Sequence, residues 1–377
     1  SNIKMLTRLG LFVQTITQFL TALRQAHPQL CTEVGDALVG RYLDREGYFA
    51  DAKSSEAPRR LQQSALDVYS LVTRFGEHKQ VAVMDLFQLV ARLYAEQCVP
   101  PTTETPERIE LQERPSSGSL QSPSDPDVTY GHKGKGYEVQ LTETCVEENA
   151  VQVITSVNLN GANESDQQQL EPALEQTERT CGAAPEELHA DCGYGSGDNI
   201  VAAHAHGTEL KAPIGAKASE QPVGLGNFTF DAAGERVLQC PTGAAPVSHK
   251  STPGGKTLAF FAMSHCQHCP LRGECPTKRR GNLQALKFSR PEVAVARRRV
   301  EQETPEFKQR HKIRSGIEAT NSELKRCHGF AKLRVRRRER VAVAVRLKVL
   351  GLNFKRYVGH LTEAFVAQAT PAPACGC

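Results

Sequence analysis

The chain is organised around one stretch, Arg314-Ser-Gly-Ile-Glu318-Ala-Thr-Asn-Ser-Glu-Leu-Lys325. On a helix that turns by about 100° per residue, one polar stripe roughly 60° wide holds His311, Arg314, Glu318 and Lys325. Ile313, Ile317 and Leu324 form a second stripe about 100° away, which predicts an apolar face packed on a sheet. The polar stripe places the Glu318 carboxylate among three side chains that can be cationic. A carboxylate can bind a metal ion and the cationic groups can contact a phosphodiester, so the stripe is compatible with a metal site beside a DNA or RNA backbone. On spacing alone, the simpler alternative is a solvated face with an Arg314–Glu318 pair at i,i+4.

Charge is distributed unevenly along the chain. The segment from Lys278 to Arg356 holds 24 Lys and Arg against 7 Glu, a net charge of +17, whereas all 377 residues together carry +4. A basic segment in an otherwise acidic protein predicts a polyanionic partner, and nucleic acid is favoured over membrane. The first residues do not read as a signal segment, and no apolar run is long enough to span a bilayer. We therefore expect a reducing cytoplasm, with the 12 cysteines free or bound to metal.

Residues 1–99 are predicted to be helical and to hold no catalytic cluster. Apolar residues recur at helical spacing in three sets, which run from Leu9 to Leu23, from Leu61 to Val72 and from Leu86 to Tyr94. Residues 100–128 are rich in Pro, Ser and Thr and are expected to form a linker or exposed loop. The aspartates of Asp125-Pro-Asp127 are interpreted as part of a turn.

The remaining pattern predicts a mixed α/β fold. Within residues 129–215, alternating segments at 137–145 and 151–159 suggest a hairpin, followed by a helix (165–180), a strand (187–191), a helix (198–206) and a strand (208–214). An insertion at 216–289 carries cysteines. Residues 290–357 hold the helix of Glu318 and end in an amphipathic helix at 341–357, and residues 358–377 are expected to be a disordered tail.

Two stretches resemble signatures of bacterial insertion-sequence transposases of the DDE type. In that family Tyr, Arg, Glu and Lys recur with two, three and six residues between them; here Arg314, Glu318 and Lys325 match, and His311 stands at the Tyr position. Leu188-His-Ala-Asp191-Cys-Gly-Tyr194-Gly-Ser196 resembles the family's second-aspartate motif, a strand that ends in Asp followed by Gly-Tyr. The similarity extends from about Tyr130 to Tyr357. It implies an RNase H-like catalytic core with an N-terminal helical region and a cysteine-containing insertion.

The resemblance also implies a function, namely metal-dependent cleavage at transposon ends and strand transfer into target DNA. Asp191 and Glu318 would bind Mg²⁺ or Mn²⁺, and two such ions activate the attacking water and neutralise charge on the reacting oxygens. The implied partners are double-stranded DNA, from transposon ends and target, and further copies of the chain assembled on it, in the bacterial cytoplasm at the nucleoid. No membrane partner is implied. The alternative role for Asp191 is that of a strand-end residue that caps the turn at Gly193.

The resemblance suggests that the first catalytic aspartate precedes this sequence. In the family, the core begins with a strand that carries that residue, and Ser1-Asn-Ile-Lys-Met resembles the segment just after that strand. We therefore expect a chain that is truncated at its N-terminus and has little or no catalysis. Glu143 and Asp127 are weak substitutes for the third carboxylate.

Four cysteines have the spacing of metal ligands: Cys240, Cys266, Cys269 and Cys275. One Cys-x-x-Cys pair with two outlying cysteines can supply four thiolates to tetrahedral zinc. An iron–sulfur cluster and free thiols are the alternatives, and His249, His265 or His268 can replace one ligand. Related transposases carry a comparable insertion, which favours structural Zn²⁺.

A basic run comes after the Glu318 helix and contains Arg334, Arg336, Arg337 and Arg338. It has too few apolar residues for a core element, so it is predicted to contact DNA phosphates, together with His311, Arg314 and Lys325. A solvated charge run is the alternative. Two other functions stay open: a non-catalytic DNA-binding or assembly remnant of a transposase, and an RNase H-like nuclease that transfers no strands.

Overall fold

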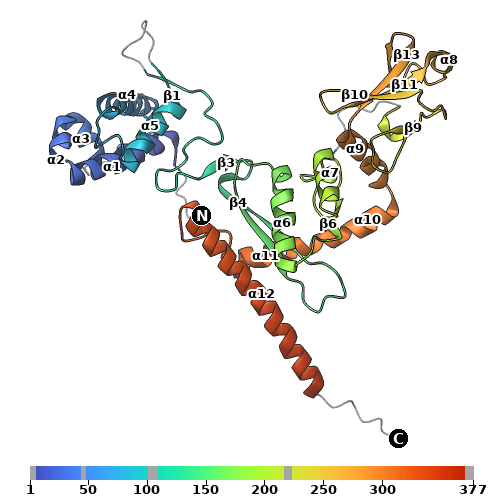
Figure 1. The fold of residues 1–377 in the computed structure, drawn as a ribbon. Helices are drawn as coiled ribbons and strands as arrows, with labels where there is room; N and C mark the ends of the chain where they lie inside the picture. The colour runs from blue at the N-terminus through green and yellow to red at the C-terminus, as the bar shows by residue number, and fades with distance from the viewer. Residues whose placement is uncertain (1–5, 44–47, 101–108, 216–222, 370–377) are drawn as a thin grey trace. The chain divides into compact units, whose positions relative to one another are not determined.

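The computed structural model describes residues 6–43, 48–100, 109–215 and 223–369 (Figure 1). The chain divides into two compact units. The first contains Ser1–Val139, Leu159–Glu164 and Leu324–Leu350, and the second contains Gln140–Asn158, Ser165–Glu323 and Gly351–Cys377. Helices and small sheets alternate along the chain, which confirms the predicted mixed α/β class.

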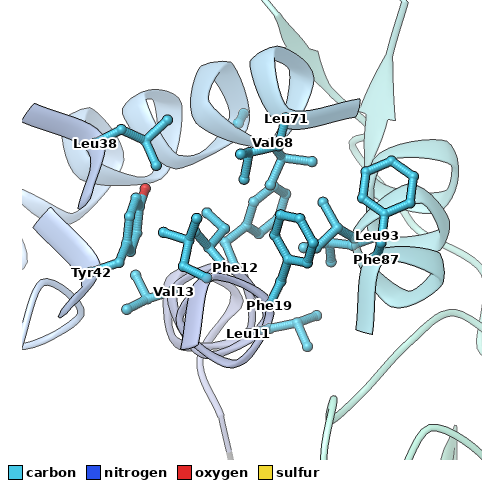
Figure 2. Close-up of a cluster of buried hydrophobic side chains, with 14 of the residues drawn as sticks. Leu11, Phe12, Val13, Phe19, Leu38, Tyr42, Val68, Leu71, Phe87 and Leu93 are labelled. Atoms are coloured by element: carbon cyan, nitrogen blue, oxygen red, sulfur yellow. The ribbon is translucent and has the colours of Figure 1, made fainter. Parts of the chain in front are cut away.

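The first unit begins with a helical core. Its helices are α1 (Arg8–Ala26), α2 (Pro28–Glu33), α3 (Asp36–Leu43), α4 (Ala57–Phe75) and α5 (Asp85–Gln97). Thr7 caps α1 by accepting a hydrogen bond from Gly10 N at 3.0 Å. The apolar set predicted from Leu9 to Leu23 is buried, and the ring of Phe19 lies 5.5 Å from that of Phe87 (Figure 2). Burial of these side chains supplies the main stabilisation of the helical core.

Residues 109–128 correct the prediction of an exposed linker. Two short strands, β1 (Cys98–Val99) and β2 (Glu110–Leu111), pair antiparallel. Ile109 and Leu120 are 0 % exposed, and Glu96 on α5 accepts a hydrogen bond from Leu120 N at 2.6 Å. Composition misled the prediction because a few buried apolar side chains and backbone hydrogen bonds are enough to hold an irregular segment. Residues 101–108 lie outside the described part.

The predicted turn at Asp125 is present. Val128 N donates to Asp125 O at 3.2 Å, and the buried Asp125 carboxylate accepts a hydrogen bond from Tyr137 OH at 2.7 Å. Asp125 therefore has a structural role.

A three-stranded sheet comes next, in the order β3 (Thr129–Gly131), β4 (Gly134–Glu143), β5 (Ile154–Gly161). It confirms the two adjacent strands predicted at 137–145 and 151–159. Gly131 allows close packing here, because a Cβ on it would lie 1.7 Å from Ala162 O.

The second unit contains a strand–helix–strand element. A 3₁₀ turn η1 (Asp166–Gln169) and α6 (Leu170–Cys181) precede β6 (Glu187–His189), and α7 (Gly197–Ala205) connects β6 to the parallel strand β7 (Glu209–Lys211). Leu170, Leu174, Ala203 and Leu210 form the small core of this element. The element order predicted for 165–214 is confirmed, although both strands are shorter than predicted.

The cysteine-bearing insertion is a β module. It contains η2 (Leu225–Asn227), β8 (Thr229–Phe230), β9 (Val237–Gln239), β10 (Ser248–Ser251), β11 (Thr257–Ala262), α8 (Met263–Cys266), β12 (Lys278–Arg280) and β13 (Leu283–Phe288). Strands β10, β11, β13 and β12 form an antiparallel sheet in that order, and β8 pairs with β9. Phe261, Leu286 and Phe288 form its buried core.

The predicted helix through 311–325 is wrong in one respect, because it is interrupted. After α9 (Arg290–Glu301) the chain forms α10 (Pro305–His311), a 3₁₀ turn η3 (Lys312–Arg314) and α11 (Ser315–Cys327). A 3₁₀ turn has about three residues, so His311 and Arg314 still lie on one side. Leu324 is 0 % exposed and Ile317 is half-buried, which confirms the predicted apolar face.

The last helix, α12 (Arg338–Ala369), corrects the predicted tail. A closing helix was expected to end at 357, but helix continues through 369 because apolar residues recur at helical spacing as far as Phe365. Residues 370–377 lie outside the described part. In the described ranges, no helix combines the length and the apolar character needed to cross a bilayer.

Candidate active site and cysteine cluster

Asp191 lies in a turn just beyond β6. The pairing of β6 with β7 extends to Ala190, whose N donates to Lys211 O at 3.2 Å. Asp191 is exposed, and its Oδ1 accepts a hydrogen bond from Gly193 N at 2.9 Å. This contact is the one expected of an aspartate that caps a turn. It also leaves the carboxylate at the surface, where a ligand can reach it.

The glycines of this turn are required by close packing. A Cβ on Gly195 would lie 1.9 Å from Pro213 O, and a Cβ on Gly197 would lie 2.2 Å from Pro291 O. The turn therefore packs directly on the backbone beyond β7 and at the start of α9.

Asp166, which sequence reasoning missed, lies beside Asp191. A Cβ on Gly193 would be 3.0 Å from Asp191 Oδ1 and 3.1 Å from Asp166 Oδ2, so both carboxylates border the same small space. Asp166 Oδ1 accepts a hydrogen bond from Gln140 Nε2 at 2.6 Å, and Gln140 Oε1 accepts one from Tyr194 OH at 2.8 Å. No signal in the sequence marks Asp166, because an acidic residue in the first turn of a helix is common.

The segment that leads to Glu318 docks on the end of β6. His311 Nε2 lies 2.9 Å from Ala190 O, and Arg310 forms an ion pair of 2.6 Å with Glu187. Because a carbonyl oxygen only accepts, His311 must donate from Nε2–H. The imidazole also stacks on Phe307, with ring centroids 5.7 Å apart and an interplanar angle of 10°. His311 thus fastens the residue before Asp191 to α10.

Helix α9 adds a second attachment, to β7. Arg298 donates to Ala212 O at 3.0 Å, and Lys211 Nζ lies 2.9 Å from Glu301 Oε1. Burial alone would raise the pKa of Glu301, but the hydrogen bond from Lys211 and the charge of Arg298 outweigh it and lower the pKa.

A small pocket of about 160 Å³ lies at this docking surface. It is lined by His189, Lys211, Glu301, Thr304, Glu306, Phe307, Arg310 and His311. Burial lowers the pKa of His189 although Glu187 acts in the opposite direction, and His189 Nδ1 has no hydrogen-bond partner in the described ranges. The pocket is smaller than the roughly 300 Å³ of typical small-molecule sites, so it does not suggest a nucleotide site.

Glu318 is exposed on α11. Its side chain is 63 % exposed, and Oε1 accepts a hydrogen bond from Arg314 at 2.9 Å, which is the i,i+4 pair considered as the simpler alternative. Lys325, two turns later, is also exposed. Seven residues separate Glu318 from His311, roughly 10 Å along a helix. The structure therefore attaches the residue before Asp191 to His311, and Glu318 lies further along the same segment without a contact to Asp191 in the described ranges.

A complete metal site is not formed by these residues. In the ranges that the structure describes, no three His, Cys, Asp or Glu side chains are arranged as a group that could hold a metal ion. Glu143, considered as a substitute ligand, is engaged elsewhere: it accepts from Thr320 Oγ1 at 2.7 Å and from Arg356 at 3.1 Å, and it is 10 % exposed. These contacts give Glu143 a structural role at α11.

The predicted basic run lies in irregular chain between α11 and α12. Arg334, Arg336, Arg337 and Arg338 are all exposed. Arg338 donates to Leu159 O at 3.0 Å, whereas the other three make no hydrogen bond or ion pair with described residues. Their charges are therefore accessible to an anionic partner.

The four predicted ligand cysteines gather in the β module. Each is partly buried, and the pKa of the Cys266 thiol is raised by burial and further by Cys275, Cys240 and Cys269. Thr242 Oγ1 lies 3.3 Å from Cys240 Sγ and 3.8 Å from Cys269 Sγ.

Of the three histidines considered as replacement ligands, only His265 contacts this cluster among the described residues. His265 Nε2 lies 3.9 Å from Cys240 Sγ, whereas His249 Nε2 accepts a hydrogen bond from Val237 N at 3.2 Å.

Comparison with known families agrees with the predicted resemblance. Residues 239–358 match the family model described as a transposase DDE domain, which confirms the resemblance to DDE-type transposases. The match includes the cysteine cluster, Glu318 and the basic run, and Asp191 lies before it. Searches of curated proteins and of solved structures found no match.

Proposed function

We propose that this chain, whose residues 239–358 match a transposase DDE domain, is of the insertion-sequence transposase kind, whose parental activity is cleavage of transposon ends and strand transfer into target DNA. An RNase H-like core is the arrangement that we assign to β4, β5, β6 and β7 with their helices. The observation that carries the proposal is the hydrogen bond between His311 and Ala190 O, because it couples the strand of Asp191 to the segment of Glu318.

Asp191 and Glu318 would hold the catalytic Mg²⁺ or Mn²⁺. Both are accessible carboxylates, and Asp166 borders the same space as Asp191, so hard oxygen donors of the kind that these ions prefer are present. When bound, divalent ions would activate water and neutralise charge on the phosphodiester. Arg314 holds the Glu318 carboxylate in place at 2.9 Å. The ammonium group of Lys325 would contact a DNA phosphate beside the cleaved bond.

The exposed arginines of the basic run would bind double-stranded DNA. Guanidinium groups without intramolecular partners lose little on binding phosphate, whereas Arg338 would have to give up its bond to Leu159 O. Because phosphate contacts release counterions, log K falls with log salt by roughly 0.9 per contact. Replacing Arg334, Arg336 and Arg337 with Gln should therefore reduce this slope by about 2 to 3.

The cysteine cluster would hold a structural Zn²⁺ once its thiols draw together, since the described residues contain no group already arranged to hold a metal ion. Cys240, Cys266, Cys269 and Cys275 supply four thiols on one module, and zinc binding would overcome the raised pKa of Cys266 by stabilising its thiolate. Titration with Co²⁺ tests this, because thiolate ligands give an intense near-ultraviolet absorption. We expect that band in the parent chain, a weaker band for Cys266→Ser because one of four thiolates is removed, and an unchanged band for Cys181→Ser. A cobalt-binding chain without the band would contradict thiolate ligation.

A second candidate is a DNA-binding remnant without catalysis. The turn-capping contact of Asp191 and the Arg314–Glu318 pair favour it, since both are what non-catalytic residues would make. It keeps the basic run and the cysteine cluster.

Metal-directed cleavage of the polypeptide separates the two candidates. Fe²⁺ takes the place of Mg²⁺ and, with ascorbate and peroxide, cuts the chain beside its ligands. For the transposase we expect cuts near both Asp191 and Glu318, suppressed by excess Mg²⁺ and by Glu318→Gln. Glu323→Gln on the same helix is the matched control and should leave the pattern unchanged. A chain that binds DNA with a steep salt dependence but shows no such cuts would be the remnant.

A further inference from the structure

Helix α12 is apolar on two opposite sides. One side holds Val341, Val345, Val349 and Leu352, which are between 0 % and 4 % exposed. These four positions fall within about 80° of one another on a helix and form the side that packs into the protein. This side explains why the helix belongs to the fold, but it accounts for only four of the 13 Val, Leu, Phe and Tyr residues of the helix. Figure 1 shows α12 as one long, unbroken helix.

The opposite side is an exposed apolar stripe, which we call the α12 seam. It consists of Val343, Leu347, Leu350, Phe354, Tyr357 and Leu361, each between 49 % and 66 % exposed. These residues also fall within about 80°, centred nearly opposite the buried side. Val358 and Phe365 flank the stripe and are exposed as well. No charged residue lies within it.

The spacing of the seam identifies the kind of surface that fits it. Successive seam residues are four, three, four, three and four positions apart. Alternation of three and four over almost three heptads is the pattern of a coiled-coil helix, whose knobs insert into a partner helix. A helix that lies on a membrane needs an apolar side but not this alternation.

We propose that the α12 seam pairs with the α12 seam of a second copy of this chain. A twofold interface uses the same surface of both copies, so it requires a self-complementary patch, and an uncharged apolar stripe meets that requirement without like-charge repulsion. The area is sufficient: eight large apolar side chains that are between 41 % and 73 % exposed remove on the order of 700–800 Å² per copy, close to the roughly 800 Å² of a standard interface. This inference does not rest on the proposed function.

The test is the oligomeric state of the full chain, free of nucleic acid, by sedimentation velocity at micromolar concentration and high salt. We expect a dimer, because apolar pairing survives salt that dissociates DNA-bridged copies. The double variant F354E/L361E should be at least a hundredfold weaker in dimerisation and should sediment as a monomer. T362E places the same charge on the same helix outside the seam, and it should remain dimeric.

Far-ultraviolet circular dichroism keeps the result interpretable. The variants should retain the helical signal of the parent chain, and the single substitution L361E should give an intermediate affinity if the double variant unfolds. A monomeric parent chain at 100 µM would overturn the proposal, as would a dimer that F354E/L361E and L361E leave intact. A monomeric parent chain that cosediments with anionic vesicles would assign the seam to a membrane instead.

Discussion

Replacing Arg356 with Met should loosen the helix of Glu318. Arg356 donates to Glu143 at 3.1 Å, to Gln152 O at 3.1 Å and to Thr320 on α11 at 2.6 Å. The side chains of Arg356 and Glu143 are 22 % and 10 % exposed. Removing one partner of a buried pair costs about 3–5 kcal/mol, and since this pair retains some water contact we expect a loss of about 2–3 kcal/mol in the free energy of unfolding. For a unit of this size that lowers Tm by about 5–10 °C.

Urea unfolding followed by circular dichroism measures this loss, with Lys355→Met as the matched control. Lys355 pairs with Glu323 on the same helix α11 at 2.7 Å, but the two side chains are 65 % and 30 % exposed, so this pair should contribute less than about 1 kcal/mol. The double variant R356M/E143M should recover at least about 1 kcal/mol relative to additivity, because it no longer strands a carboxylate. Equal losses for R356M and K355M, or strict additivity in the double variant, would refute the reasoning.

Three further outcomes are expected from single contacts. Gly195→Ala should destabilise the protein by about 2 kcal/mol or more, since its Cβ would meet Pro213 O at 1.9 Å, while Cys192→Ala in the same turn should change the unfolding free energy by less than about 0.5 kcal/mol. Because the pKa of Glu301 is lowered on folding, its ionised carboxylate stabilises the protein above pH 4.5, the ordinary pKa, and this stabilisation is lost as the pH falls through the lower pKa of the folded state. Glu301→Gln should therefore flatten the dependence of the unfolding free energy on pH in that acid range. An unchanged curve would contradict the pairing with Lys211. His311→Phe should keep the ring stack on Phe307 but lose the hydrogen-bond donor to Ala190 O, so Fe²⁺-directed cuts near Asp191 should weaken while DNA affinity stays constant. His311→Tyr should restore these cuts. A loss of DNA affinity would instead assign His311 to phosphate contact.

The sequence predicted elements well where periodicity was strong. The α1 core and the strand–helix–strand element around Asp191 are predictable from apolar spacing alone, because one face of each is buried. Prediction failed where a residue's role depends on a partner distant in the chain. Asp166 reads as an ordinary helix-start residue until Gly193 brings it beside Asp191, and residues 109–128 read as a linker until Ile109 packs into the helical core.

The same distinction explains α12. Residues 341–357 were predicted as an amphipathic helix, whereas the stretch beyond 357 keeps only a few exposed apolar residues and was therefore predicted as a tail. The residues were interpretable only once the buried side was known, because the remaining apolar positions then required a second explanation.

The geometry also gives a physical reason for His at a position where the resembling family has Tyr. Both residues place a flat ring and one terminal hydrogen-bond donor at the end of a short side chain. Here the ring stacks on Phe307 and the donor reaches Ala190 O, one residue before Asp191. A Tyr side chain offers the same two contacts, the stack through its ring and the hydrogen bond through its hydroxyl, whereas an aliphatic or acidic residue offers neither. The exchange of Tyr for His therefore preserves the attachment between the α10 segment and β6. The seven-residue spacing from His311 to Glu318 then sets the distance along the segment between this attachment and the Glu318 carboxylate.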